Sequence, residues 1–168
     1  MHKRITLFTE FIFVFVLLIA CGPLPTPPPP TNTPTPSKPI IRISQPSTAA
    51  SVPHEVPVKG TLENISKDAH LWLLVLTASR DTYYPSVVPI SVFENGDWEG
   101  KVYLGDGTDK YKGYKYSIII AVADESTHQR LEEYAEEALA TQNYGVGIPV
   151  IEIKEGLALY DNVEVTLE

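Results

Sequence analysis

The longest apolar run beyond the amino-terminal segment covers residues 69–77, which read AHLWLLVLT. Alternate residues of a strand point to opposite faces, and in this run both alternating sets are apolar. We therefore predict a central strand that is covered on both faces. The run is too short to span a membrane as a helix, and the polar residues on either side of it indicate turns. The two sets are Leu71, Leu73 and Val75, and Trp72, Leu74 and Leu76.

Shorter stretches of alternating apolar and polar residues indicate further strands on both sides of this run. Asn95-Gly96 is a strong signal for a tight hairpin between two of them. Proline cannot donate a backbone hydrogen bond, so we expect Pro57 to face outward or lie at an edge, and Pro89 to mark an edge strand. We assign Trp72 and Trp98 to the core. The predicted strands cover residues 39–44, 55–62, 87–93, 98–104, 114–123, 150–153 and 157–167.

After Asp124 the apolar positions change to helical spacing, which predicts a helix over residues 127–141. Ser126 followed by Gln129 fits a capping box at the start of this helix. Asp124 and Glu125 also precede it, where carboxylates favour the helix dipole. The expected end lies near residues 143–145. The apolar residues at this spacing are Leu131, Tyr134, Ala135, Ala138 and Leu139, and the opposite face carries Glu132, Glu133, Glu136 and Glu137.

About seven strands, with turns every 8–12 residues, predict a mainly β fold, an antiparallel β-sandwich with one late inserted helix. This folded domain is expected to cover residues 40–168. The chain has one cysteine, Cys21, so no internal disulfide can form and the sandwich must be held by burial alone.

Residues 1–20 have the composition of a secretory signal peptide, with a short basic segment followed by an apolar stretch. Leu18-Ile19-Ala20-Cys21 resembles the lipobox of bacterial lipoproteins, in which the cysteine becomes the first mature residue and carries a lipid. The resemblance implies attachment to the cell membrane through a lipid on Cys21, with the domain facing outside the cytoplasm. The alternative is an uncleaved transmembrane anchor, for which the apolar run is short and contains Glu10.

The segment 21–39 is predicted to be a linker, because nine of the 18 residues in 22–39 are proline. Such a sequence favours polyproline II, which at about 3.1 Å per residue spans up to about 55 Å. We interpret it as a stalk through a cell-wall layer, with threonines that are candidates for glycosylation. The alternative is a proline-rich ligand for a partner domain.

The net charge of −8 disfavours binding to polyanions, so we expect no nucleic-acid partner. No hydrolase or phosphate-binding motif occurs in the sequence. His54, His70 and His128 lack the spacing of a zinc pair. The sequence therefore predicts a protein that is not an enzyme and that needs no cofactor.

The only candidate metal ligands are Asp106 and Asp109, in the oxygen-rich stretch 105–109. This stretch is similar to a calcium loop but lacks the length and the closing glutamate of an EF-hand. A solvated turn between strands is the preferred interpretation.

Four tyrosines are the best candidates for binding a ligand, because we place them in connections between strands. Exposed tyrosines combine a large contact area with a polar tip and often contact sugars and proteins. The alternative is that they pack over the rim of the sandwich. These residues are Tyr83, Tyr84, Tyr111 and Tyr114.

Several short stretches between residues 40 and 124 are similar to a largely uncharacterised group of bacterial extracellular immunoglobulin-like domains. The resemblance implies an immunoglobulin-like sandwich that serves as a binding or scaffold module in the cell envelope, and it implies no catalytic residues. The chain lacks the paired cysteines of antibody domains, and the helix is not part of the plain fold. The stretches are Val58-Lys59-Gly60, Leu71-Trp72, Tyr83-Tyr84-Pro85, Trp98, Leu104-Gly105 and Ala123-Asp124.

These observations lead to one main hypothesis and two alternatives. The main hypothesis is a surface-tethered, non-catalytic lipoprotein whose domain binds a glycan or a protein of the envelope. The first alternative is a structural or assembly subunit that recognises another protein through its acidic helix or an edge strand. The second is an envelope hydrolase, which would need converging polar groups in a pocket.

Overall fold

The computed structural model describes residues 37–168. The segment Pro36–Glu168 forms one compact unit. The predicted signal peptide, the lipobox with Cys21 and most of the proline-rich linker lie outside the described residues.

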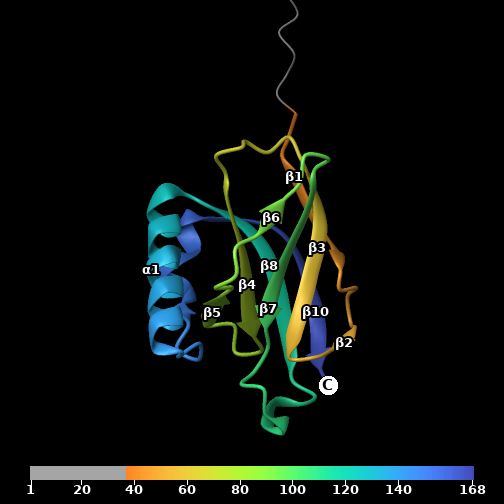
Figure 1. The fold of residues 1–168 in the computed structure, drawn as a ribbon, viewed down its shortest axis with the longest axis vertical. Helices are drawn as coiled ribbons and strands as arrows, with labels where there is room; N and C mark the ends of the chain where they lie inside the picture. The colour runs from red at the N-terminus through yellow and green to blue at the C-terminus, as the bar shows by residue number, and fades with distance from the viewer. Residues whose placement is uncertain (1–36) are drawn as a thin grey trace, which may run out of the picture. The chain divides into compact units, whose positions relative to one another are not determined.

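Two β-sheets face each other, as predicted for a β-sandwich (Figure 1). In the four-stranded sheet, neighbouring strands are antiparallel. The four-stranded sheet has the order β1 (Ile40–Gln45), β3 (Glu55–Glu63), β7 (Asp97–Tyr103) and β6 (Ser91–Val92). The six-stranded sheet has the order β2 (Ser51–Val52), β10 (Leu157–Leu167), β8 (Lys115–Ala123), β4 (His70–Thr77), β5 (Thr82–Pro85) and β9 (Ile148–Pro149). Three strands lie outside the predicted ranges: β2 and β9, with two residues each, and β5, with four.

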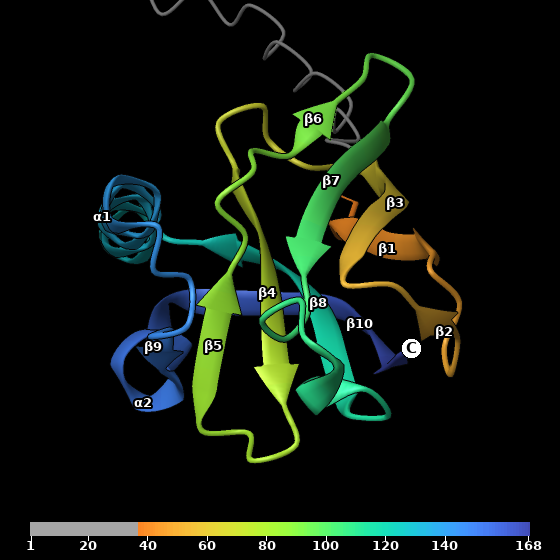
Figure 2. The same ribbon diagram turned by 60° about the horizontal axis from the view of Figure 1, so that its bottom comes forward.

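Helix α1 (Glu125–Thr141) packs on the outer face of the six-stranded sheet, and Figure 2 shows it nearly end-on beside that sheet. This confirms the late helix. Three further short elements are η1 (Asp109–Tyr111), α2 (Val150–Ile153) and η2 (Lys154–Gly156). Within residues 37–168, no helix is long and apolar enough to cross a membrane.

Strand β4 lies between two hydrophobic cores, as its two apolar faces predict. Leu73 and Val75 point into the core between the sheets, where Trp98 is 1% exposed. Leu74 points into a second core beneath α1, together with Leu131 of the helix. The half-buried Trp72 packs against the edge of this second core.

The N-cap of α1 is Asp124 rather than Ser126, so the predicted capping box is wrong. The Asp124 carboxylate accepts a hydrogen bond from the backbone N–H of Thr127 at 2.8 Å. The Gln129 side chain donates to the carboxylate of Glu125 at 3.0 Å instead of reaching back to the cap. The helix therefore starts two residues earlier than predicted, because Asp124 already satisfies a free N–H of its first turn.

Two strand predictions are wrong. Residues 87–93 contribute only the two-residue β6, because the segment crosses from one sheet to the other. The Ser86 hydroxyl fixes this crossing by donating to the carbonyl oxygen of Lys101 at 2.6 Å. Residues 150–153 form α2 and turn Ile153 into the second core. Periodicity alone cannot separate a short apolar strand from a short buried helix.

Substitution of Gly60 tests the close contact between β1 and β3. A Cβ atom at Gly60 would lie 1.9 Å from the backbone oxygen of Arg42 and 2.5 Å from the Trp98 ring. We expect Gly60→Ala to lower the free energy of unfolding by about 2–3 kcal/mol, since neither neighbour can move freely. In Gly145→Ala, the added Cβ meets nothing closer than 3.8 Å, and we expect a change within about 0.5 kcal/mol. Urea denaturation of both variants measures the difference, and equal stability would contradict the packing described here.

Asp124 makes the stability of α1 dependent on pH. Hydrogen bonds from the Thr127 backbone and side chain hold the pKa of the Asp124 carboxyl below its ordinary value. The folded state therefore binds this proton less readily than the unfolded chain, so the contribution is present above pH ~4 and disappears as the pH falls through the folded pKa. We expect the parent to melt at a higher temperature than Asp124→Asn near pH 6, with the gap closing toward about pH 2. A gap that does not change with pH would show that the charge of Asp124 plays no part.

Candidate functional site

Two adjoining cavities lie at one end of the sandwich, with volumes of about 710 Å³ and about 180 Å³. They share Tyr103, Gly105, Asp106, Tyr144 and Gly145 in their walls. We call the two together the tyrosine cleft. Its volume is in the range of pockets that take small molecules.

Five tyrosines line this cleft, and each comes from a different part of the chain. Tyr103 and Tyr144 are 41% and 46% exposed, so they form the accessible part of the wall. Burial raises the pKa of Tyr116, which is only 5% exposed. The five are Tyr84 of β5, Tyr103 at the end of β7, Tyr111 of η1, Tyr116 of β8 and Tyr144 after α1.

The loops that carry these tyrosines are held by contacts of their own. The Tyr134 hydroxyl of α1 donates to the carbonyl oxygen of Tyr144 at 3.4 Å, which ties the segment after the helix to the helix itself. Gly105 has φ of +66°, and a Cβ atom there would lie 3.0 Å from the Cβ of Tyr111. Glycine is therefore required where β7 turns into the loop beneath the cleft.

Polar groups lie beside the tyrosines in the cleft. The Asp106 carboxylate accepts hydrogen bonds from the hydroxyl and the backbone N–H of Thr108, at 2.6 and 2.9 Å. These bonds lower the pKa of Asp106, so the group is a charged acceptor at neutral pH. Gln142 and Asn143 add amide donors and acceptors at the end of α1. The His54 ring lies 5.7 Å from the ring of Tyr103, between centroids.

The structure places the four predicted tyrosines in different surroundings. Tyr83 and Tyr84 lie within β5, so their expected position in a connection is wrong. Tyr83 is 5% exposed and packs in the core beneath α1, because its register in β5 points it toward the helix. Tyr84 points the other way and lines the cleft together with Tyr111. Tyr114 is 55% exposed and stacks edge-on against Tyr111, with ring centroids 5.5 Å apart, but it is not part of the cleft wall.

The two candidate metal ligands are engaged in local contacts. Asp106 holds Thr108, and the Asp109 carboxylate lies 3.1 Å from the ammonium group of Lys112. Among the residues that the structure describes, no three His, Cys, Asp or Glu side chains are grouped so that they could hold a metal ion.

Three tyrosines of the cleft were not among the predicted site residues. The sequence pattern did indicate an exposed position for Tyr103, because this aromatic residue shares a strand face with the charged Glu99 and Lys101. Tyr116 fits the apolar alternation of β8 and looks like any core residue in the sequence. Tyr144 follows α1 in a polar stretch, and only the packing of the helix brings it to the cleft.

No known protein family matches this sequence, and no curated protein is similar to it. The geometry of the described residues is therefore the basis for the functional inference below.

Substitution of Tyr83 is expected to lower the stability of the domain far more than substitution of Tyr103. Tyr83→Ala opens a cavity in the core beneath α1, and we expect it to lower the free energy of unfolding by about 3–5 kcal/mol. Tyr103→Ala removes a side chain that is 41% exposed, and we expect a loss below about 1 kcal/mol. Urea denaturation followed by circular dichroism measures both values. A small loss for Tyr83→Ala would mean that this residue is not a core residue.

Proposed function

We propose that this chain is a surface-tethered lipoprotein whose β-sandwich domain is a non-catalytic module that binds a glycan in the tyrosine cleft. Attachment through a lipid on Cys21 and the proline-rich stalk of residues 21–39 are parts of this proposal. An immunoglobulin-like domain in the cell envelope is consistent with both.

The single observation that carries the proposal is the gathering of five tyrosines around one cleft. Sugar rings have apolar faces that pack on aromatic rings, and their hydroxyl groups need hydrogen-bond partners. Tyrosine provides an aromatic face and a hydroxyl group together. Asp106, Gln142 and Asn143 add charged and amide groups at the same place.

The position of the cleft within the sandwich suits a tethered module. Ile40 at the start of β1 pairs with Glu63, whereas Glu55 at the other end of β3 pairs with Tyr103 in the cleft wall. The nine residues of β3 separate these ends by roughly 27 Å, at about 3.3 Å per residue. Figure 1 shows the start of β1 and the loop around η1 at opposite ends of the domain. The chain therefore enters the domain at the end opposite the cleft.

Sedimentation with insoluble polysaccharides tests the proposal. The full chain, purified in a mild detergent, is incubated with bacterial cell-wall sacculi and with insoluble plant polysaccharides. We expect the parent to sediment with at least one of them. We expect Tyr103→Ala/Tyr144→Ala to bind about tenfold more weakly or worse, because it removes the two most exposed aromatic faces of the cleft.

The matched control is Val92→Ala/Phe93→Ala, which removes two exposed apolar side chains outside the cleft wall. This control should bind like the parent. Equal losses in both double variants would move the site away from the cleft, and a parent that sediments with none of the polysaccharides would refute glycan binding to them.

A further inference from the structure

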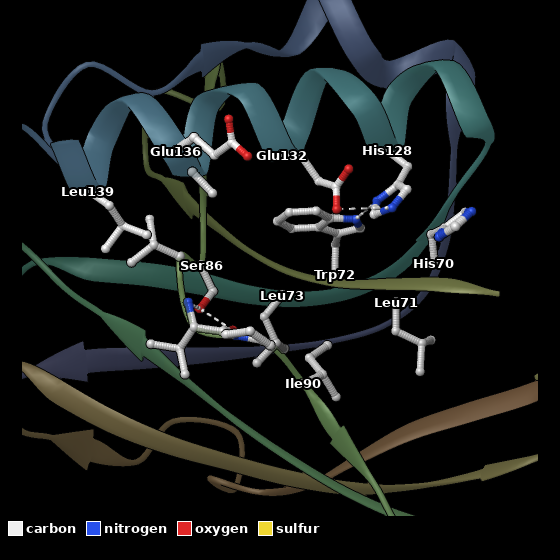
Figure 3. Close-up of a pocket in the computed structure, with 14 residues that line it drawn as sticks. His70, Leu71, Trp72, Leu73, Ser86, Ile90, His128, Glu132, Glu136 and Leu139 are labelled. Atoms are coloured by element: carbon white, nitrogen blue, oxygen red, sulfur yellow. Dashed lines mark hydrogen bonds and ion pairs between the residues drawn. The ribbon is translucent and has the colours of Figure 1, made fainter. Parts of the chain in front are cut away.

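A third cavity, of about 390 Å³, lies between α1 and the segment 86–90, and Figure 3 shows its lining. We call it the α1 groove. Its opposite wall is Ser86–Ile90, and Trp72 rises toward the helix from β4. The helix contributes one stripe at helical spacing, made of His128, Glu132, Ala135, Glu136 and Leu139.

A short series of side-chain contacts places a carboxylate at this groove. The indole N–H of Trp72 donates to Nδ1 of His128 at 3.1 Å. Nε2 of the same ring lies 3.4 Å from a carboxylate oxygen of Glu132. His128 therefore lies between Trp72 of the sheet and Glu132 of the helix.

The other charged groups around the groove leave it negative. His70 stacks on His128 with ring centroids 3.7 Å apart, and its Nε2 lies 3.1 Å from the carboxylate of Glu125. Glu136 forms no ion pair within residues 37–168. The lining includes no lysine or arginine to offset the two glutamates. A ligand that brings a positive charge would therefore be favoured at the helix side.

The floor of the groove contains an unpaired strand edge. β5 pairs with β4 only at Leu74, Val75 and Leu76, and the Leu73 carbonyl oxygen then accepts from the backbone N–H of Ser86 at 2.8 Å. In an antiparallel strand, every second residue directs its N–H and C=O to the same side, so the backbone of Leu71 points to this side as well. No backbone hydrogen bond joins Leu71 to the described residues across the groove.

We propose that the α1 groove binds an extended segment of a partner protein in which apolar residues alternate with lysine or arginine. The segment would add as a short strand along β4 at Leu71, where β5 is missing. Side chains of such a strand alternate between two sides. One set meets Leu71, Leu73 and Ile90 toward the sandwich, and the other meets Glu132 and Glu136 on the helix.

Trp72 provides a built-in reporter for this binding. The chain has two tryptophans, and Trp98 is 1% exposed in the core, so a bound peptide should change the fluorescence of Trp72 alone. The probe is the acetylated and amidated peptide Val-Lys-Val-Lys-Val, added to the full chain in mild detergent at low salt. We expect saturable binding, at least tenfold weaker binding of Val-Glu-Val-Glu-Val, and weaker binding as the salt concentration rises.

Two double variants of α1 locate the site. Glu132→Gln/Glu136→Gln removes the charges of the groove, and we expect it to weaken binding of the lysine peptide by about tenfold. Glu133→Gln/Glu137→Gln makes the same change in net charge with exposed residues outside the groove lining, and we expect at most a twofold effect. Equal effects of the two double variants would overturn the proposal, because attraction to the overall negative charge would then explain the binding.

The free edge of β4 is tested with modified peptides, so that the test needs no variant of the protein that could fail to fold. Methylation of the backbone nitrogens on the valines removes the N–H donors of one edge, and methylation of those on the lysines removes the donors of the other. Strand addition uses only one edge, so we expect one methylated peptide to bind at least tenfold more weakly than the other. Equal binding of both would overturn strand addition.

Two further outcomes would contradict the proposal. Binding of butylamine as tight as that of the peptide would show that the groove takes a small organic cation. No binding of the lysine peptide at about millimolar concentration would also refute the proposal.

Discussion

The architecture depends on one constraint, which is that strand β4 is apolar on both faces and must be covered on both. The four-stranded sheet covers the face with Leu73 and Val75, and α1 covers the face with Leu74. A sandwich without the helix would expose the second face to water. Burial of each large apolar side chain stabilises the fold by about 1.5–3 kcal/mol, and that contribution would be lost. The helix is therefore a structural part of the fold and not an appendage.

The position of α1 also shapes the α1 groove and the tyrosine cleft. Its exposed edge forms one wall of the α1 groove, and the segment after its last turn brings Tyr144 to the tyrosine cleft. Val87, Val88 and Leu139 lie in the walls of the groove and of the larger cavity of the cleft, so the two sites are neighbours along the helix.

The two sites differ in the kind of partner that their surfaces favour. The cleft combines aromatic faces with neutral and anionic hydrogen-bonding groups, which suits a polyhydroxylated ligand. The groove combines apolar walls, carboxylates and an open strand edge, which suits a peptide.

The sequence by itself determined the two-sided character of β4, the hairpin at Asn95-Gly96 and the presence of a late helix, because hydrophobic period and turn chemistry are local properties. The sequence did not determine which tyrosines come together around the cleft. Tyr83 and Tyr84 are neighbours in the sequence, yet one enters the core and the other the cleft, because the pairing of β5 with β4 fixes which face each one takes. The five tyrosines of the cleft come from five segments that meet only in the folded chain, and long-range packing alone decided that meeting.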